Sequence, residues 1–282
     1  MTSSIIRFGN HTVDWKKSPH MLVSGVTGSA KTSALLLASL SSMSTKGIST
    51  DIQGMKSKVY FVDGKGALGS ILNKDIAVTS NQLAKLLRIM VENMQSRYRN
   101  FSGLFGMDST DYTDEIGRSV RPIIICIDEL GIFLNDPKLR SEISRYLFQL
   151  LVGARQASIY VSPRLGQHVM VGIQRPSAEI LPRDTSLQFN TRILLAPNGA
   201  DSDTKRMLFP MTNVQSLPIV ESNEVGNARG TGLIYEEGLN WMVPRPLYLP
   251  DISQIDIPGV VKRIEDEVNP NWFIKEDYWK EP

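Results

Sequence analysis

The sequence predicts an α/β protein built on a doubly wound, mainly parallel sheet. Strand-like apolar runs alternate with helical patterns along most of the chain, which is typical of this class. Residues 123–127 form a continuous apolar run, as expected of a central parallel strand that is buried on both faces. A glycine-rich turn also joins the run Met21-Leu22-Val23 to a helical segment, as strand–loop–helix units of such sheets do.

The elements follow one another in a clear order. Residues 5–8 and 12–15 flank the turn dipeptide Gly9-Asn10 and predict an N-terminal hairpin. The clearest helix covers 81–99, where an apolar stripe repeats at helical spacing opposite a charged face. The other expected elements are strands over 21–24, 59–63, 122–129, 168–173 and 191–195, helices from 33 to about 42 and over 138–152, a polar loop at 101–119, and a hairpin-like pair at 230–235 and 240–244.

The composition is that of an ordinary globular protein, with 41% hydrophobic and 21% charged residues among 282. The net charge of +2 neither supports nor excludes a nucleic-acid partner. Cys126, the single cysteine, is expected to be a small buried hydrophobe, which fits a reducing cytoplasm. No apolar stretch approaches the ~20 residues that span a bilayer, and residues 1–4 do not begin a signal peptide. We therefore expect any membrane association to come through a partner.

A phosphate-binding loop is predicted directly after the strand at 21–24. Residues 25–32 read Gly-Val-Thr-Gly-Ser-Ala-Lys-Thr, and a helix opens at Lys-Thr. Such a P-loop turns backbone N–H groups inward around an anion, and the helix N-terminus adds the positive end of its dipole. Lys31 can then reach the terminal phosphates, and the Thr32 hydroxyl can bind Mg²⁺. The predicted nucleotide-binding residues are Gly25, Val26, Thr27, Gly28, Ser29, Ala30, Lys31, Thr32 and Ser33.

The loop departs from the P-loop pattern at one position. Ala30 stands where the pattern has glycine, and a methyl group is tolerated there if the backbone keeps a negative φ. We therefore predict a negative φ at Ala30 with the ring of amide groups preserved. A positive φ would indicate that the alanine impairs nucleotide binding.

Two carboxylates follow the most apolar strand. The run at 122–127 stops at Asp128 and Glu129, at the strand end where α/β sheets bind ligands. In P-loop enzymes the first such acid holds Mg²⁺ and a neighbouring acid can polarise the attacking water. These roles fit Asp128 and Glu129, respectively.

A second glycine-rich segment, residues 64–69, matches the G-x-G-x-x-G pattern of dinucleotide-binding proteins and follows a strand. The acidic residue expected after the next strand is missing, because residues 76–78 run into Thr79-Ser80-Asn81. We therefore interpret 64–69 as a flexible loop after a strand and not as a dinucleotide site.

Several further segments resemble motifs of one family. Residues 18–25 look like its "PHLLVAG" entry into the P-loop, and 93–98 look like its "EMERRY" helix. Residues 59–65 are similar to its strand ending in Asp-Pro-Lys, with Gly64 in place of proline. Residues 174–177 match its "TQRPS" motif, and 190–193 resemble its "PTRI" strand. In this order, from about residue 5 to 249, the chain resembles the motor domain of the FtsK/SpoIIIE DNA translocases, in the FtsK–HerA group of P-loop ATPases.

The resemblance implies a RecA-like P-loop NTPase with a C-terminal extension. It divides the chain into an N-terminal hairpin at 1–19, a motor domain at 20–250 and a tail at 251–282. The family's "RAAGIH" stretch looks split here, with residues 157–165 as an inserted surface loop. That split leaves its arginine open: Arg155, after a long helix, resembles the arginine that such motors project into the next subunit, and Arg164 and Arg192 compete for that role.

By resemblance, the catalytic residues are Lys31, Glu129, Gln174 and Arg155. Lys31 stabilises the β and γ phosphates, Thr32 and Asp128 hold Mg²⁺, and Gln174 senses the γ-phosphate. ATP is the expected nucleotide, since the chain has no Asn-Lys-x-Asp motif that would read guanine.

The expected function is an ATP-driven translocase of double-stranded DNA, acting as a hexameric ring in the cytoplasm. Such motors serve cell division, plasmid transfer or conjugation, here with a membrane-anchored partner as one expectation. No helix-turn-helix or platform of aromatic and basic residues stands out, so DNA binding would be to phosphates and independent of sequence. Three alternatives stay open: a viral genome-packaging ATPase of the same superfamily, a secretion-system ATPase that moves proteins, and a nucleotide-binding assembly factor without turnover.

Overall fold

A computed structural model of the chain describes residues 5–15, 17–43, 57–101, 123–160, 167–220, 230–239 and 241–266. The predicted polar loop at 101–119, apart from its first residue, lies outside the described residues. So do residues 161–165 of the predicted insertion, which include Arg164.

Nine strands and eight α-helices make up the described part of the chain. The strands are β1 Ile5–Phe8, β2 His11–Asp14, β3 His20–Gly25, β4 Lys58–Asp63, β5 Ile123–Asp128, β6 Gln167–Ile173, β7 Thr191–Leu195, β8 Thr231–Glu236 and β9 Arg245–Tyr248. The helices are α1 Lys31–Met43, α2 Ala67–Leu72, α3 Ser80–Phe101, α4 Leu130–Phe133, α5 Pro137–Tyr160, α6 Arg183–Ser186, α7 Ser202–Leu208 and α8 Ile257–Asp266, with short 3₁₀ turns η1 Pro197–Gly199 and η2 Val214–Ser216.

The main sheet has seven strands in the order β4-β5-β6-β3-β7-β8-β9. In this order, the first five strands, β4, β5, β6, β3 and β7, are parallel to one another. Strand β8 pairs antiparallel with β7, and β9 pairs antiparallel with β8 at the edge of the sheet. The predicted N-terminal hairpin forms as a separate antiparallel pair of β1 and β2. The predicted fold class, a mainly parallel α/β sheet with an N-terminal hairpin, is therefore confirmed.

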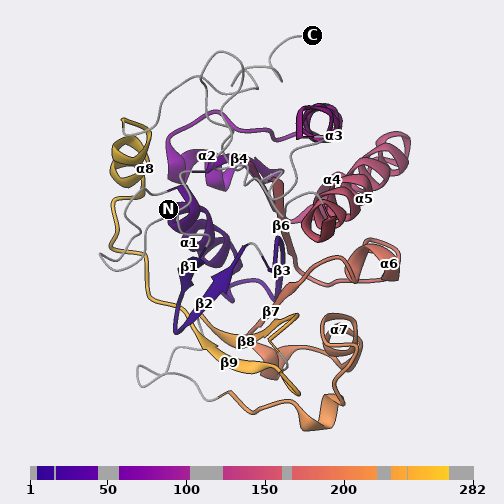
Figure 1. Ribbon diagram of the computed structural model, residues 1–282. Coiled ribbons are helices and arrows are strands. Elements are labelled where there is room, and N and C mark those ends of the chain that lie inside the picture. Colours follow the sequence, from indigo (N-terminus) through magenta and orange to yellow (C-terminus); the bar gives the residue numbers. More distant parts are fainter. Residues whose placement is uncertain are drawn as a thin grey trace.

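Helices cover both faces of the sheet (Figure 1), and alternate strand residues point into two separate cores. On one face α3 and α5 pack over Ile125, Ile127 and Val171. On the other face α1, α2, α8 and the β1–β2 hairpin pack over residues such as Cys126 and Met170. Burial on both faces explains why the central strands are apolar at consecutive positions.

Three predicted boundaries were wrong. Helix α5 continues to Tyr160, because Ala154, Gln156 and their neighbours favour a helix and the next proline is Pro163, so the predicted insertion starts inside this helix. The loop predicted at 64–69 is shorter, because residues 67–69 belong to helix α2. The last strand is β9 at 245–248 and not 240–244, since Arg245 pairs with Ile234 of β8. Pro246 is tolerated in β9 because this strand lies at the sheet edge.

The C-terminal helix α8 packs against its own chain. Ile257, Val261 and Ile264 are buried in the core on the α1 side of the sheet, and α8 contacts α2. Within the described residues, no helix combines the length and the apolar character that crossing a membrane would require.

Candidate nucleotide-binding site

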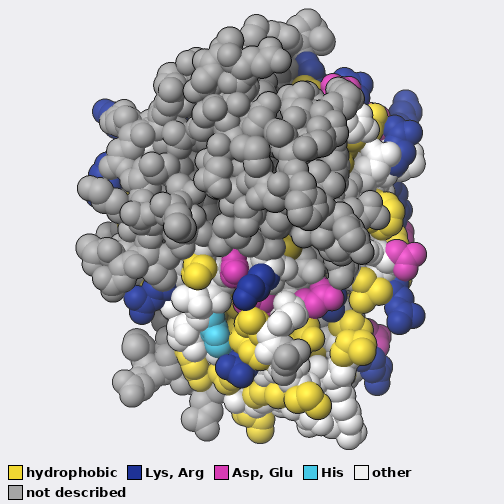
Figure 2. All heavy atoms as spheres, in the orientation of Figure 1, with side chains coloured by type: hydrophobic (Ala, Val, Ile, Leu, Met, Phe, Trp, Pro, Cys, Tyr) yellow, Lys and Arg dark blue, Asp and Glu magenta, His cyan; other side chains and the backbone are white. Residues whose placement is uncertain are grey.

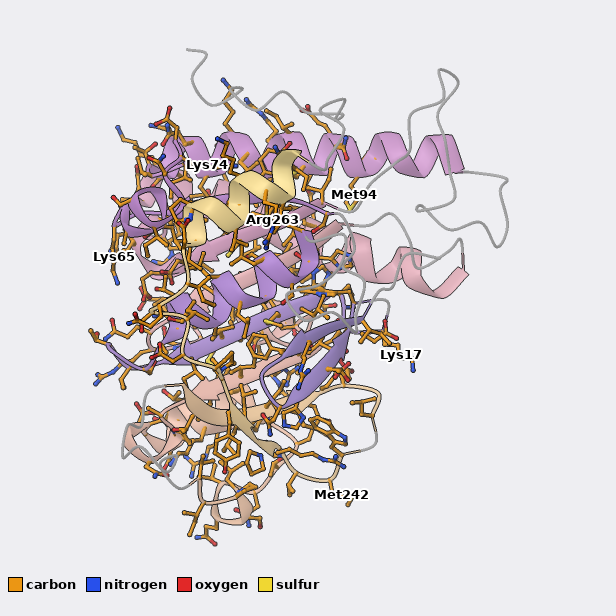
Figure 3. All side chains as sticks on the ribbon, turned by 90° about the vertical axis from the view of Figure 1, so that its left-hand side faces the viewer. Lys17, Lys65, Lys74, Met94, Met242 and Arg263 are labelled. Carbon is orange, nitrogen blue, oxygen red and sulfur yellow. The ribbon has the colours of Figure 1, made fainter. Side chains whose placement is uncertain are left out.

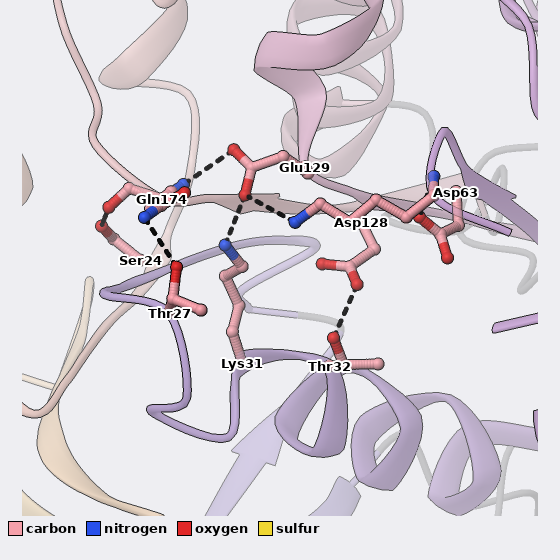
Figure 4. Close-up of polar contacts among 9 residues, drawn as sticks. Ser24, Thr27, Lys31, Thr32, Asp63, Asp128, Glu129 and Gln174 are labelled. Carbon is pink, nitrogen blue, oxygen red and sulfur yellow. Dashed lines mark hydrogen bonds and ion pairs between the residues drawn. The ribbon is translucent and has the colours of Figure 1, made fainter. Parts of the chain in front are cut away.

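The P-loop, Gln174 and the acidic pair lie together at the carboxyl ends of the parallel strands. They do so because β3, β6 and β5 are parallel neighbours. The P-loop follows β3, Gln174 follows β6, and Asp128 and Glu129 end β5. Figure 4 shows these side chains converging between the start of α1 and the end of β5. The sheet order thus brings together residues that are 45 to 147 positions apart in the chain.

The P-loop adopts a tight turn that only small residues permit at two points. At Gly25, a Cβ would collide with the Ser29 hydroxyl. At Gly28 the backbone has a φ of 82°, in the left-handed region that favours glycine. Helix α1 begins immediately afterwards, and the Ala30 carbonyl accepts the Ala34 N–H at 2.9 Å. Helix geometry leaves the N–H groups of residues 31–33 without an acceptor inside the helix, which makes them available to an anion.

The predicted negative φ at Ala30 was wrong: the residue has a φ of 73°. The loop has to reverse direction between Gly28 and the first turn of α1, and a second left-handed residue makes that reversal possible. For an alanine this conformation costs roughly 1–2 kcal/mol, because Cβ crowds the following carbonyl oxygen. Ala30 therefore strains the loop, and whether the inward orientation of the amides is preserved stays a prediction.

We expect Ala30→Gly to stabilise the protein. The relief of ~1–2 kcal/mol of left-handed strain exceeds the ~0.4–1 kcal/mol that glycine adds to the entropy of the unfolded chain. The melting temperature should rise by a few degrees, and nucleotide affinity should rise by at most about tenfold. Ala34→Gly, inside α1, is the matched control and should lower stability by about 1 kcal/mol or more. A fall in melting temperature for both variants would contradict strain at Ala30.

Glu129 lies at the centre of the site. Its Oε2 forms an ion pair with Lys31 Nζ at 2.6 Å, and both side chains are 10% exposed. Its Oε1 accepts the backbone N–H of Gln174 at 2.9 Å (Figure 4). The residue itself has a φ of 64° and stands at the N-terminal end of α4. A left-handed glutamate costs of order 1–3 kcal/mol, and such strain is typical of positions with a functional constraint.

Gln174 connects the acidic residue to the P-loop. Its side-chain Nε2 donates to the Thr27 hydroxyl at 2.9 Å, while its backbone N–H donates to Glu129. One residue at the end of β6 thus contacts both segments between which the phosphates would lie. This geometry suits a residue that responds to the γ-phosphate.

Thr32 and Asp128 offer oxygen atoms that fit Mg²⁺. The Thr32 hydroxyl donates to Asp128 Oδ2 at 2.6 Å, and within the described residues the buried Oδ1 of Asp128 accepts no hydrogen bond. Burial raises the pKa of the Asp128 carboxyl, and the neighbouring Asp63 and Glu129 raise it further, against the Thr32 hydrogen bond and Lys31, which lower it. A divalent cation would satisfy the free oxygen and offset the acidic charge.

Two residues that shape this site were not among those predicted for it. Asp63, at the end of β4, accepts the backbone N–H groups of Lys65 and Leu68 and lies beside Asp128 in the sheet. At Gly172 in β6, a Cβ would stand 3.0 Å from Asp128 Oδ1, so glycine leaves space for that carboxylate. A glycine inside an otherwise apolar strand was the sequence signal for Gly172.

The structure describes two of the three arginines that were predicted as candidates for action on a neighbouring subunit. Arg155 was predicted to follow the long helix, but it lies within α5. Its side chain is outside the described part of the structure. Arg192, in β7, is 5% exposed and donates to the carbonyls of Phe189 and Leu208. A buried guanidinium with two internal acceptors is a structural group, so Arg192 is unsuited to act on another subunit.

The placement of the acidic pair defines the class of protein. The strand that carries Asp128 is separated from the P-loop strand by β6, and the intervening strand ends in Gln174. This sheet is consistent with a RecA-like P-loop fold, which is the fold that the family resemblance implied.

The curated relatives of this chain are FtsK-type proteins. The FtsK domain-containing protein YdcQ of Bacillus subtilis is 29% identical over 200 residues, which are 68% of this chain and 37% of that protein. The DNA translocase FtsK of Lactococcus lactis subsp. cremoris is 24% identical over 280 residues, 92% of this chain and 33% of the translocase. The chain thus spans about a third of the length of these relatives. No family model matches it. The predicted resemblance to FtsK/SpoIIIE motor domains is confirmed.

Solved structures share the fold. The pCW3 conjugation coupling protein TcpA, in a monomer form with ATPγS, has a TM-score of 0.67 at 21% identity, over 94% of this chain and 71% of TcpA. The cytoplasmic domain of the type VII secretion ATPase EccC from Thermomonospora curvata has a TM-score of 0.59 at 16% identity, over 92% of this chain and 30% of that one. At these identities the likeness shows the RecA-like fold alone.

Proposed function

We propose that the chain binds Mg²⁺ and ATP at the P-loop and hydrolyses ATP. The observation that carries this proposal is the convergence of Lys31, Thr32, Asp128, Glu129 and Gln174 at one sheet edge. Phosphoryl transfer depends on neutralising and positioning charge more than on covalent chemistry, and these groups supply both.

Each residue has a distinct role in this proposal. Lys31 neutralises the β and γ phosphates, together with the N–H groups of the loop and of the first turn of α1. Thr32 and Asp128 hold the metal ion, which supplies further positive charge when bound. Glu129 orients the attacking water and accepts its proton, and Gln174 relays the state of the γ-phosphate to the rest of β6.

We further propose that hydrolysis drives translocation along double-stranded DNA by a homo-oligomeric, hexameric ring in the cytoplasm. The support is the sequence similarity to proteins named DNA translocases, of which this chain covers a third. On the described part of the face in Figure 2, Lys and Arg side chains are scattered among acidic and hydrophobic ones. A membrane-anchored partner would tie such a ring to the site of DNA transfer.

Arg155 is our choice for the arginine that acts on the neighbouring subunit's nucleotide. The internal contacts of Arg192 support this choice in part, since they remove one of the three candidate arginines and leave Arg155 and Arg164. An arginine supplied in trans can raise phosphoryl-transfer rates by about 10³–10⁵-fold.

The test is the ATPase rate with and without linear duplex DNA, together with the particle mass in the presence of ATP. We expect stimulation that is independent of DNA sequence, decreases with rising salt, and accompanies the mass of a hexamer. The Lys31→Ala variant, purified in parallel, corrects for contaminating ATPases. Hydrolysis that ignores DNA but responds to a secreted protein would instead indicate a secretion ATPase. Nucleotide binding without any hydrolysis would indicate an assembly factor.

A further inference from the structure

A second lysine stands beside the acidic residue of the site. Lys65 Nζ lies 4.0 Å from Glu129 Oε2, the same oxygen that Lys31 contacts at 2.6 Å. The Lys65 side chain is 57% exposed, whereas Lys31 is 10% exposed. In Figure 3, Lys65 lies at the edge of the molecule opposite Lys17, and these lysines mark the carboxyl and amino ends of the strands.

The turn that carries Lys65 is fixed by its neighbours. Asp63 is fully buried, and its two carboxylate oxygens accept the N–H of Lys65 at 2.9 Å and of Leu68 at 3.0 Å. The Gly66 N–H donates to the Asp63 carbonyl at 3.0 Å, which closes the turn. At Gly64 a Cβ would come within 2.8 Å of Ile132, in the helix that follows Glu129. The Lys65 backbone is therefore held against the segment that carries Glu129, and its side chain can move.

We propose that Lys65 is a positioning residue that takes over the contact with Glu129 Oε2 when Lys31 engages the phosphates. The inference rests on the proposed function, since it follows from the two partners that Lys31 would have. The Lys31 ammonium cannot remain 2.6 Å from Glu129 and also serve the γ-phosphate fully, because both are anions competing for one cation. Lys65 is the other lysine that the structure places on that oxygen, so it lowers the cost of the exchange and keeps the carboxylate in place for water.

The charges around Glu129 make this exchange specific. Within the described residues, Lys31 and Lys65 are the cations paired with it, while Asp128 and Asp63 stand at the ends of β5 and β4. Without Lys65, Lys31 would be the cation left to balance the negative charge of Glu129, which lies near these acids and the incoming phosphate. Glu129 would then hold Lys31 more tightly, and nucleotide would bind more weakly.

The test is a double-mutant cycle on the affinity for Mg·ATPγS, with Lys65→Met made in the native protein and in Glu129→Gln. We expect Lys65→Met to weaken binding about two- to fivefold in the native background, the range for a partly exposed ion pair. In the Glu129→Gln background the same change should have no effect, because the charge to be balanced is absent. Lys65→Arg should restore at least half of the lost affinity. Lys262→Met, an exposed lysine on α8, is the matched control and should leave affinity unchanged.

Each other outcome overturns the proposal. Equal weakening in both backgrounds would mean that Lys65 contacts the nucleotide directly and does not act through Glu129. No weakening in the native background would mean that its side chain has no role in the site. A melting temperature lowered as much as that of Gly64→Ala would assign Lys65 to the fold. Failure of the proposed function is distinguishable, since the native protein itself would then not bind Mg·ATPγS.

Discussion

Lys31→Ala is expected to abolish ATP hydrolysis and to weaken nucleotide binding severely. In the proposed site Lys31 is the cation that pairs with the phosphates, and removing one partner of a largely buried charge pair costs about 2–5 kcal/mol, which lowers nucleotide affinity about thirtyfold or more. Thermal melting measures the effect. Mg·ATPγS at a hundred times the native Kd should stabilise the native protein by about 2.7 kcal/mol and the variant by about 0.9 kcal/mol or less.

The control for this variant is Lys138→Ala, which removes an exposed lysine at the start of α5. It should melt and respond to nucleotide like the native protein. A Lys31→Ala protein that remains folded and hydrolyses ATP at a near-normal rate would defeat the assignment of the P-loop.

Glu129→Gln should keep Mg·ATP binding and lose turnover. The amide preserves the shape of the side chain and an oxygen for the Gln174 N–H, but it cannot accept a proton from water. General-base catalysis contributes about 10²–10⁴-fold, so kcat should fall by that factor. Affinity should stay the same or rise, because the charge that competes with phosphate for Lys31 is gone. Single-turnover hydrolysis and equilibrium binding of ATP together separate the two effects.

Glu179→Gln provides the comparison for this change. Glu179 is 78% exposed and pairs with Arg140. Losing that contact should leave both kcat and affinity unaltered. Native-like hydrolysis by Glu129→Gln would place the base elsewhere.

The parts of the site that lie within one stretch of sequence were predictable. The P-loop and the acidic pair at 128–129 each combine a strand with the residues that follow it, and local periodicity is enough to find them. The contacts of Glu129 with Lys31 and Lys65 were not predictable from spacing, since they depend on β4, β5 and β3 being ordered in one sheet. The resemblance to a known family assigned Lys31 a role at the phosphates, and it included Lys65 in the motif at 59–65 without assigning it a role.

Backbone conformation was the other limit. The left-handed φ values of Ala30 and Glu129 are imposed by how the loops close, and neither residue type favours them. Because alanine disfavours a positive φ, its presence at position 30 suggested a loop with a negative φ there. In the structure the loop closes with a positive φ at Ala30, and the backbone is strained at that residue. Likewise, the end of α5 could not be located from residues that favour a helix on both sides of the expected boundary.

The buried oxygen of Asp128 has a consequence for how quickly and how tightly a metal ion can be captured. A carboxylate in water must shed its own hydration before it coordinates an ion, but Oδ1 has lost its water already on folding. The dehydration cost therefore falls on the stability of the domain and not on binding. Because burial raises the folded-state pKa above the unfolded value, the stabilising protonated form is lost as pH rises through that pKa. At neutral pH burial of this carboxylate thus lowers the stability of the domain, and the same burial pre-organises the acid for the Mg²⁺ ion that we propose it binds.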